Sequence, residues 1–305
     1  MPTVSSLNAV RAVKGGVRPA LRARALSSGG TDEPYTHVDL VPCTPVIGAE
    51  VRGVDLAEPL DGPVLAELKR ALLEWKVLFF RGQKLTAPRH AEVARHWGEP
   101  EVHPFLPKAE IPEVVRLAHD EKTPGVENIW HSDVSFSATP PLGSMLRAVE
   151  VPLVGGDTLW ADMAAAYDGL PARVRELIDG RTATHDFVRS FGQLLSTEQL
   201  EAARAKNPPV QHPVVRTHPE TGRKILYVNR VFTDRIDGLP GAESAELLEL
   251  LYEQARHPEY QCRFHWERGS VAFWDNRITQ HYAVSDYFPA PRVMERVTLK
   301  GDRPR

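Results

Sequence analysis

The sequence predicts a mainly β fold with helical insertions, of the double-sheet jelly-roll type. Many short segments with strand-like patterns are spread along the chain, and helical segments are inserted among them. The pattern contains no internal repeat and no alternating strand–helix series of the kind that builds a parallel sheet. With 305 residues, 42% of them hydrophobic, the chain is long enough for one large domain. We interpret it as a single domain whose helices pack on the outside of one sheet.

The folded region begins with short strands around one helix. Residues 37–42 are expected as a strand, and so are 47–54, where apolar residues alternate with small or polar ones. A helix is expected over 63–76, because apolar residues recur there at helical spacing and Pro63 suits the first turn. The mostly apolar run at 77–82 predicts a buried strand.

Helices and strands alternate irregularly through the rest of the chain. One helix has a clear start signal, since Ser196 and Gln199 have the spacing of a capping box, and Pro208 follows its end. The helices expected in this part are 87–97, 161–178, 196–206 and 243–256. The strands expected are 143–149, a strand that follows the turn at 155–160, 212–216, 224–228, 260–267, 270–275 and 293–299.

Residues 1–34 are predicted to be a disordered basic tail, followed by a domain over 35–305. The tail contains several arginines, few large apolar side chains and no acidic residue before Asp32. An Arg-rich, acid-free N-terminus is also typical of a mitochondrial transit peptide. We expect a cytoplasmic protein, with a mitochondrial location as the alternative.

Composition argues against several classes of partner. A net charge of −3 gives no indication of attraction to nucleic acid or a membrane surface. The two cysteines, Cys43 and Cys262, are too few for a disulfide framework or a cysteine-based metal site. No apolar run approaches the ~20 residues that span a bilayer. The expected partner is a small molecule, and the expected assembly is a homo-oligomer, a dimer or a tetramer.

The stretch 130–136 contains two side chains that can bind a metal, His131 and Asp133. In a strand or extended loop, residues i and i+2 point the same way, so the imidazole and the carboxylate would converge. Together they make two thirds of a 2-His-1-carboxylate triad, the ligand set of non-haem Fe(II) oxygenases. On its own the motif is a weak signal, and without further support a surface loop in which the aspartate caps a turn is the favoured interpretation.

A second, isolated histidine follows about 150 residues later, in the stretch 273–283 that contains Gln280-His281-Tyr282. Arg292 and Arg296 come after it, and the run 155–160, Gly-Gly-Asp-Thr-Leu-Trp, lies between the two histidines. In this order the four motifs resemble the taurine dioxygenase family of Fe(II)- and 2-oxoglutarate-dependent oxygenases. The resemblance covers about residues 36–303, and the fold it implies is a double-stranded β-helix, or jelly roll.

The resemblance implies an iron centre ligated by His131, Asp133 and His281, with 2-oxoglutarate and O₂ as cosubstrates. It places Thr158 as a hydrogen-bond donor to the 2-oxoglutarate carboxylate and Arg292 as the partner of its far carboxylate, for which a bidentate guanidinium is the best match. Decarboxylation to succinate and CO₂ would drive hydroxylation of a C–H bond. A hydrolase that uses zinc on the same ligands, or a metal-binding protein without oxygenase activity, remains the alternative.

The implied substrate is small and anionic. The family's pattern carries over to a pocket of His103, Ser190, Phe191, Phe232 and Arg296, whereas Phe187 is expected to be ordinary core. Arg292 and Arg296 share one face of a strand about 13 Å apart, at ~3.3 Å per residue, so each can serve a different anion. We expect taurine or a related alkyl sulfonate, cleaved to an aldehyde and sulfite. Leu106 stands where the taurine-specific members have a tyrosine, and an alkyl sulfate or an aryloxyacetate is the alternative.

Overall fold

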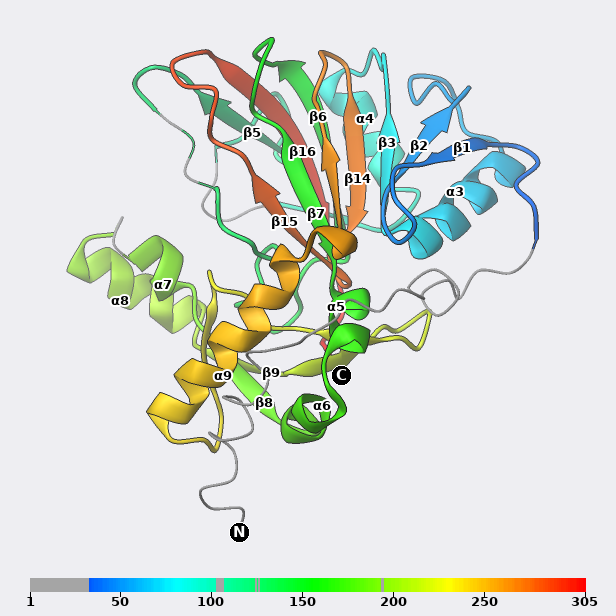
Figure 1. Cartoon of the computed structure of the whole chain (residues 1–305). Helices are drawn as coiled ribbons and strands as arrows, with labels where there is room; N and C mark the ends of the chain where they lie inside the picture. The colour runs from blue at the N-terminus through cyan, green and yellow to red at the C-terminus, as the bar shows by residue number, and fades with distance from the viewer. Residues whose placement is uncertain (1–32, 103–106, 124, 126, 193–194) are drawn as a thin grey trace.

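The computed structural model describes residues 33–102, 107–123, 125, 127–192 and 195–305. Within these ranges the chain is mainly β with helices, as predicted (Figure 1). The largest sheet has eight strands, and a three-stranded sheet β13-β7-β15 contributes to the same core. A second three-stranded sheet, β12-β8-β9, and the hairpin β10-β11 complete the strand pairings.

The eight-stranded sheet runs in the order β1-β2-β3-β14-β6-β16-β4, with β5 also paired to β16. Only β2 and β3 are parallel among the paired strands of the described residues. The bounds are β1 Asp39–Pro42, β2 Ala49–Arg52, β3 Val77–Phe80, β4 Pro100–Glu101, β5 Val114–His119, β6 Gly143–Glu150, β14 Val271–Asp275 and β16 Arg292–Leu299. Its central strands are therefore far apart in sequence, which is typical of a fold built from long-range antiparallel pairing.

The three-stranded sheet consists of β13 (Gln261–Phe264), β7 (Thr158–Asp162) and β15 (Thr279–Ala283). Large aromatic side chains fill the core that it shares with the eight-stranded sheet. Phe79 stacks on Phe264 with ring centroids 4.1 Å apart and meets Trp160 edge-on at 5.3 Å. This aromatic core fixes the positions of β7 and β15, which carry Thr158 and His281.

Helices α3 (Gly62–Trp75) and α4 (Ala87–Ala94) cover the other face of the eight-stranded sheet. Asp61 caps α3 by accepting a hydrogen bond from the N–H of Val64, and Pro63 lies in its first turn. Leu68 and Leu72 of α3 belong to the same buried cluster as Phe80 and Phe273 of the sheet. For these two helices, the predicted packing on the outside of one sheet is confirmed.

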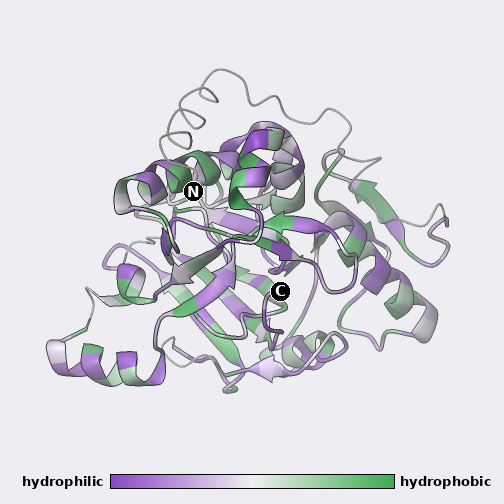
Figure 2. Ribbon diagram, turned by 90° about the horizontal axis from the view of Figure 1, so that it is seen from below, coloured by the Kyte–Doolittle hydropathy of each residue, from purple (hydrophilic) through white to green (hydrophobic). Residues whose placement is uncertain are grey.

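The remaining elements lie in the lower part of Figure 1. Most of them pack around one hydrophobic cluster, whereas the helices at 188–191 and 197–206 pack in a second cluster that includes Phe136 and Phe232. They are α5 Met163–Gly169, α6 Ala172–Ile178, β8 Thr182–His185, α7 Val188–Phe191, α8 Thr197–Lys206, β9 Val210–Pro213, β10 Val215–Thr217, β11 Lys224–Leu226, β12 Thr233–Ile236 and α9 Gly241–Glu253. Short 3₁₀ segments follow at 254–256 and 258–260. Figure 2 shows hydrophobic and hydrophilic residues mixed along strands and helices, as expected of elements with one buried face.

Several element boundaries differ from the predictions. The single helix predicted over 161–178 is two helices, because Pro171 lacks an N–H and drives Leu170 out of helical geometry. The strand predicted over 212–216 is divided between β9 and β10, which pair in different sheets. Strands β5, β8, β12 and β15 were not predicted, because their short segments show little alternation. The capping box of Ser196 and Gln199 is confirmed.

Residues 1–32 lie outside the described residues, so the division into a tail over 1–34 and a domain over 35–305 stays a prediction. Among the described residues, no helix is both long and apolar enough to cross a membrane.

Candidate metal centre

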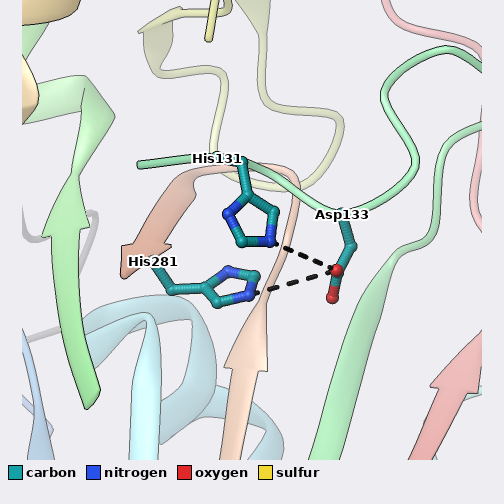
Figure 3. A group of neighbouring side chains, drawn as sticks. All are labelled: His131, Asp133 and His281. Carbon is teal, nitrogen blue, oxygen red and sulfur yellow. Dashed lines mark ion pairs between the residues drawn. The ribbon is translucent and has the colours of Figure 1, made fainter. Parts of the chain in front are cut away.

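His131, Asp133 and His281 point toward one another (Figure 3). Nε2 of His131 lies 3.8 Å from Oδ1 of Asp133, and Nε2 of His281 lies 4.0 Å from the same oxygen. The potential ligand atoms of the three residues all lie within 4.8 Å of one another. Ligand atoms that share one ion at ~2.0–2.2 Å lie about 3–4 Å apart, so a small contraction would bring all three onto one metal. The predicted convergence of the three side chains is present.

Main-chain hydrogen bonds bring the two histidines together. His131 and His281 form an isolated antiparallel bridge, with N–H to O distances of 3.1 and 2.8 Å. Nδ1 of His131 lies 2.7 Å from the carbonyl oxygen of Ile129. Since a carbonyl can only accept, Nδ1 carries a proton, and Nε2 is the ring nitrogen available to bind a metal.

The surroundings of His281 favour the neutral form of its imidazole. Burial, reinforced by the neighbouring His131, lowers the pKa of His281 to about 3, although Asp133 opposes the shift. A neutral imidazole is the form that binds a metal. The described residues offer no hydrogen-bond partner to its Nδ1.

Asp133 is buried and held at both its side chain and its main chain. Arg296 Nη1 donates to Oδ1 and Oδ2 at 3.1 and 3.2 Å, and the Ser144 hydroxyl donates to Oδ2 at 3.3 Å. The Asn276 side chain accepts from the main-chain N–H of Asp133 at 2.7 Å and donates to its carbonyl oxygen at 3.0 Å. These hydrogen bonds orient the carboxyl group before any ligand arrives.

The contact with Arg296 was not anticipated. The sequence analysis assigned Arg296 to an anionic substrate, whereas in the structure its guanidinium pairs with the candidate ligand Asp133. Nε of Arg296 is buried and has no hydrogen-bond partner among the described residues. Arg296 can thus serve Asp133 through Nη1 and still offer a donor to a second anion, and its substrate role stays a prediction.

Arg292 is a buried cation with two unused donors. Its side chain is 5% exposed, and its Nε and Nη2 have no hydrogen-bond partner among the described residues. Burial lowers the pKa of Arg292, while Tyr287, Glu127 and Asp157 act in the opposite direction. A buried guanidinium with free donors is costly unless an anion pairs with it. A carboxylate such as that of 2-oxoglutarate fits this arrangement.

The Gly155-Gly156 run allows the backbone to approach Arg292. Both residues have positive φ, 82° and 69°. A Cβ on Gly156 would lie 3.3 Å from Cδ and Nε of Arg292, closer than most side-chain contacts. Asp286 fixes the run by accepting the Gly156 N–H at 2.8 Å. Only a residue without a side chain leaves this space beside the guanidinium.

Thr158 begins β7 two residues after Gly156 and is buried. Its Oγ1 accepts a hydrogen bond from Trp266 Nε1 at 2.9 Å. A hydroxyl that accepts this bond retains its own proton for donation. The structure thus leaves Thr158 able to play the donor role that was predicted for it.

An aromatic group lies next to the loop that follows Asp133. Ring centroids of Phe136 lie 5.1 Å from Phe232, 6.2 Å from Phe191 and 5.9 Å from Phe187. Phe187 is 1% exposed, in line with the core role expected for it. Phe191 and Phe232, from distant parts of the chain, thus reach one apolar wall beside the centre.

Two other predicted substrate residues lack such support. Ser190 lies half-buried in α7, where its N–H bonds to the Phe187 carbonyl, and its substrate role stays a prediction. His103 and Leu106 lie outside the described residues.

Three residues near the centre were missed by the sequence analysis: Phe136, Ser144 and Asn276. Phe136 is three residues from Asp133 and Asn276 is five from His281, so both belonged to motif stretches that had already been singled out. Ser144 had no local signal, because it lies on β6 between β14 and β16, and its hydroxyl meets Asp133 only in the folded chain.

Comparison with known proteins gives one consistent result. Residues 39–298 match the model of the family described as taurine catabolism dioxygenase TauD, TfdA family. The chain is 40% identical over 276 residues to an alpha-ketoglutarate-dependent sulfate ester dioxygenase of Pseudomonas putida, covering 88% of this chain and 91% of that protein.

Solved structures agree with the sequence matches. A crystal structure of a putative alpha-ketoglutarate-dependent taurine dioxygenase from Burkholderia xenovorans is similar, with a TM-score of 0.77 and 39% identity over 88% of this chain and 94% of that one. The structure of AAD-2 in complex with Mn(II) and N-oxalylglycine also has a TM-score of 0.77, with 30% identity over 88% of this chain and 99% of that one.

Proposed function

Since this chain belongs to the taurine catabolism dioxygenase TauD, TfdA family, we propose that it hydroxylates a small anionic organosulfur compound with Fe(II), 2-oxoglutarate and O₂. His131, Asp133 and His281 would hold the iron, with a ring nitrogen from each histidine and a carboxylate oxygen from the aspartate. The convergence of these three side chains is the observation that carries the proposal. When bound, iron would activate O₂, so that one oxygen atom is inserted into a substrate C–H bond while the other oxidises 2-oxoglutarate to succinate and CO₂.

The protein's own task toward 2-oxoglutarate is to bind and orient it. Arg292 pairs with one carboxylate through Nε and Nη2, the two donors that lack a partner among the described residues. Thr158 donates its hydroxyl proton to a carboxylate of the same molecule. The position of Gly156 against Arg292 and two residues before Thr158 supports a shared site. Burial of Arg292 keeps water from competing for the guanidinium.

The substrate combines an anionic head with an apolar body. Arg296 supplies the positive end through its buried Nε, and Phe136, Phe191 and Phe232 supply the apolar wall. His103 and Ser190 complete the pocket in this proposal. An apolar wall neither solvates nor pairs an ammonium, so alkyl sulfonates and alkyl sulfate esters suit the pocket better than taurine, which is accepted less well. The name of the similar protein from Pseudomonas putida, a sulfate ester dioxygenase, is in line with such substrates, whereas the name of the Burkholderia xenovorans protein specifies taurine.

We also infer that the eight-stranded sheet and β13-β7-β15 form a double-stranded β-helix, with the metal at one mouth. The shared aromatic core of the two sheets supports this architecture. Residues 35–305 then constitute one catalytic domain.

The test is a substrate panel with the purified enzyme, Fe(II) and 2-oxoglutarate. Taurine, short and long alkyl sulfonates, alkyl sulfates and aryloxyacetates are compared by O₂ consumption and succinate formation. Hydroxylation at the carbon bearing the sulfur group collapses to an aldehyde plus sulfite from a sulfonate, or plus sulfate from a sulfate ester, so the inorganic product identifies the class. Turnover of non-anionic compounds alone would exclude an organosulfur anion as substrate. Hydrolysis without succinate would instead indicate a zinc hydrolase.

A further inference from the structure

The side-chain amide of Asn276 bonds to both main-chain polar groups of Asp133, and we propose that Asn276 is a positioning residue of the metal centre. This inference rests on the proposed function, in that the triad is taken to bind a metal. Asn276 lies between β14 and β15 and is 1% exposed. The sequence indicated no role for Asn276 itself, which only lies in the stretch 273–283 that contains His281.

Residues 131–133 run alongside residues 276–281 and contact them at three successive points. The first is the main-chain bridge between His131 and His281. The second is the Ser132 hydroxyl, which donates to the carbonyl oxygen of Thr279 at 2.8 Å. The third is Asn276, whose Oδ1 and Nδ2 bond to the N–H and carbonyl of Asp133 at 2.7 and 3.0 Å. A side-chain amide thus takes the place of a partner strand at the third point.

A side chain is needed there because the chain turns away immediately after Asp133. Val134 has a φ of 52°, the left-handed region that β-branched residues avoid, and the N–H of Ser137 closes a turn onto its carbonyl. Such a strained conformation persists only where surrounding contacts determine it. The two hydrogen bonds from Asn276 to the main chain of Asp133, the residue before Val134, are among these contacts.

The amide of Asn276 is fully used, which makes it a rigid support. Its second Nδ2 proton is directed to the Pro141 carbonyl at 3.2 Å, and its own N–H donates to Leu142 at 2.9 Å. The amide orientation follows from these partners, since Oδ1 faces an N–H and Nδ2 faces two carbonyls. Asn276 therefore sets the distance between the Asp133 loop and the segment that carries His281.

The inference is tested with Asn276→Ala and its effect on metal binding. Binding sites need their ligands held within about 0.5 Å, and loss of a group that orients a ligand typically lowers metal affinity about 10–100-fold. We expect that loss in an anaerobic titration with Fe(II) and in one with Co(II). The absorption spectrum of the Co(II)-loaded variant should also change, because it reports the arrangement of the ligands.

Gln83→Ala is the matched control. The Gln83 amide also clamps a main chain, accepting from the Leu56 N–H at 2.7 Å and donating to the carbonyls of Val54 and Arg81 at 3.1 and 2.9 Å. It contacts none of the three candidate ligands. Its removal should lower the melting temperature while leaving the Co(II) affinity and spectrum as in the wild type.

An Asn276→Ala protein that is folded and matches the wild type in Co(II) affinity and spectrum overturns the inference. If that variant does not fold, Asn276→Asp is used, since it retains the acceptor for the Asp133 N–H but places an oxygen against the Asp133 and Pro141 carbonyls. It should show the same loss of affinity, and wild-type affinity in it is equally decisive against the proposal. Failure of the wild type itself to bind a divalent metal would refute the proposed function instead.

Discussion

Replacing Arg292 with methionine should sharply raise the 2-oxoglutarate concentration that the enzyme needs. Arg292 is 5% exposed, and two of its nitrogens, Nε and Nη2, have no partner among the described residues, so a bound carboxylate would receive two charge-assisted hydrogen bonds. Breaking a buried ion pair by removing one partner costs about 3–5 kcal/mol. At about 1.4 kcal/mol per tenfold, the KM for 2-oxoglutarate should rise roughly one hundred- to a few thousand-fold.

The assay is succinate formation at increasing 2-oxoglutarate, together with direct titration of 2-oxoglutarate into the metal-loaded protein. Arg292→Lys, which keeps the charge but loses the planar fork, should lie between the wild type and the methionine variant. Arg216→Met is the matched control, because Arg216 is likewise buried and its Nε and Nη1 find no hydrogen-bond partner in the described part of the chain, but its Nη2 pairs with Asp302. The reasoning is refuted if Arg292→Met keeps the wild-type KM, or if Arg216→Met raises the KM equally.

Three further outcomes are expected. His281→Ala should lose Co(II) binding and succinate formation, whereas the wild type stripped by a chelator should regain activity with Fe(II); activity that survives the substitution would exclude His281 as a ligand. Phe232→Ala should raise the KM for long alkyl substrates more than for short ones, because it removes apolar contact worth ~0.8 kcal/mol for each CH₂ left unburied. An equal effect on long and short substrates would show that the alkyl chain of the substrate does not contact Phe232. Burial raises the pKa of Asp275, but Arg277 and His218 outweigh it and hold this pKa below its usual range. The stability from this ionised carboxylate is present above about pH 4, the ordinary aspartate value, and lost as the pH falls further. The gap in melting temperature between wild type and Asp275→Asn should therefore shrink between pH 7 and pH 3, and a constant gap would contradict the assignment.

Much of the framework was predictable because its signals are local. The capping box at Ser196 and the apolar run of β3 each depend on a few neighbouring residues. Strands such as β12 were missed because their sequences carry no such pattern and become strands only by pairing with distant segments.

The sequence by itself indicated which residues could form a metal site, because the motifs that contain His131, Asp133, His281 and Arg292 are specific in combination and in this order. Only the tertiary structure decided which other groups meet them. Arg296 donates to the side chain of Asp133, and Asn276 bonds to the main chain of Asp133. Both contacts form because β14 and β15 pair with strands more than a hundred residues earlier in the sequence. No local pattern encodes contacts of that range, since they depend on the long-range pairing of strands in the folded chain.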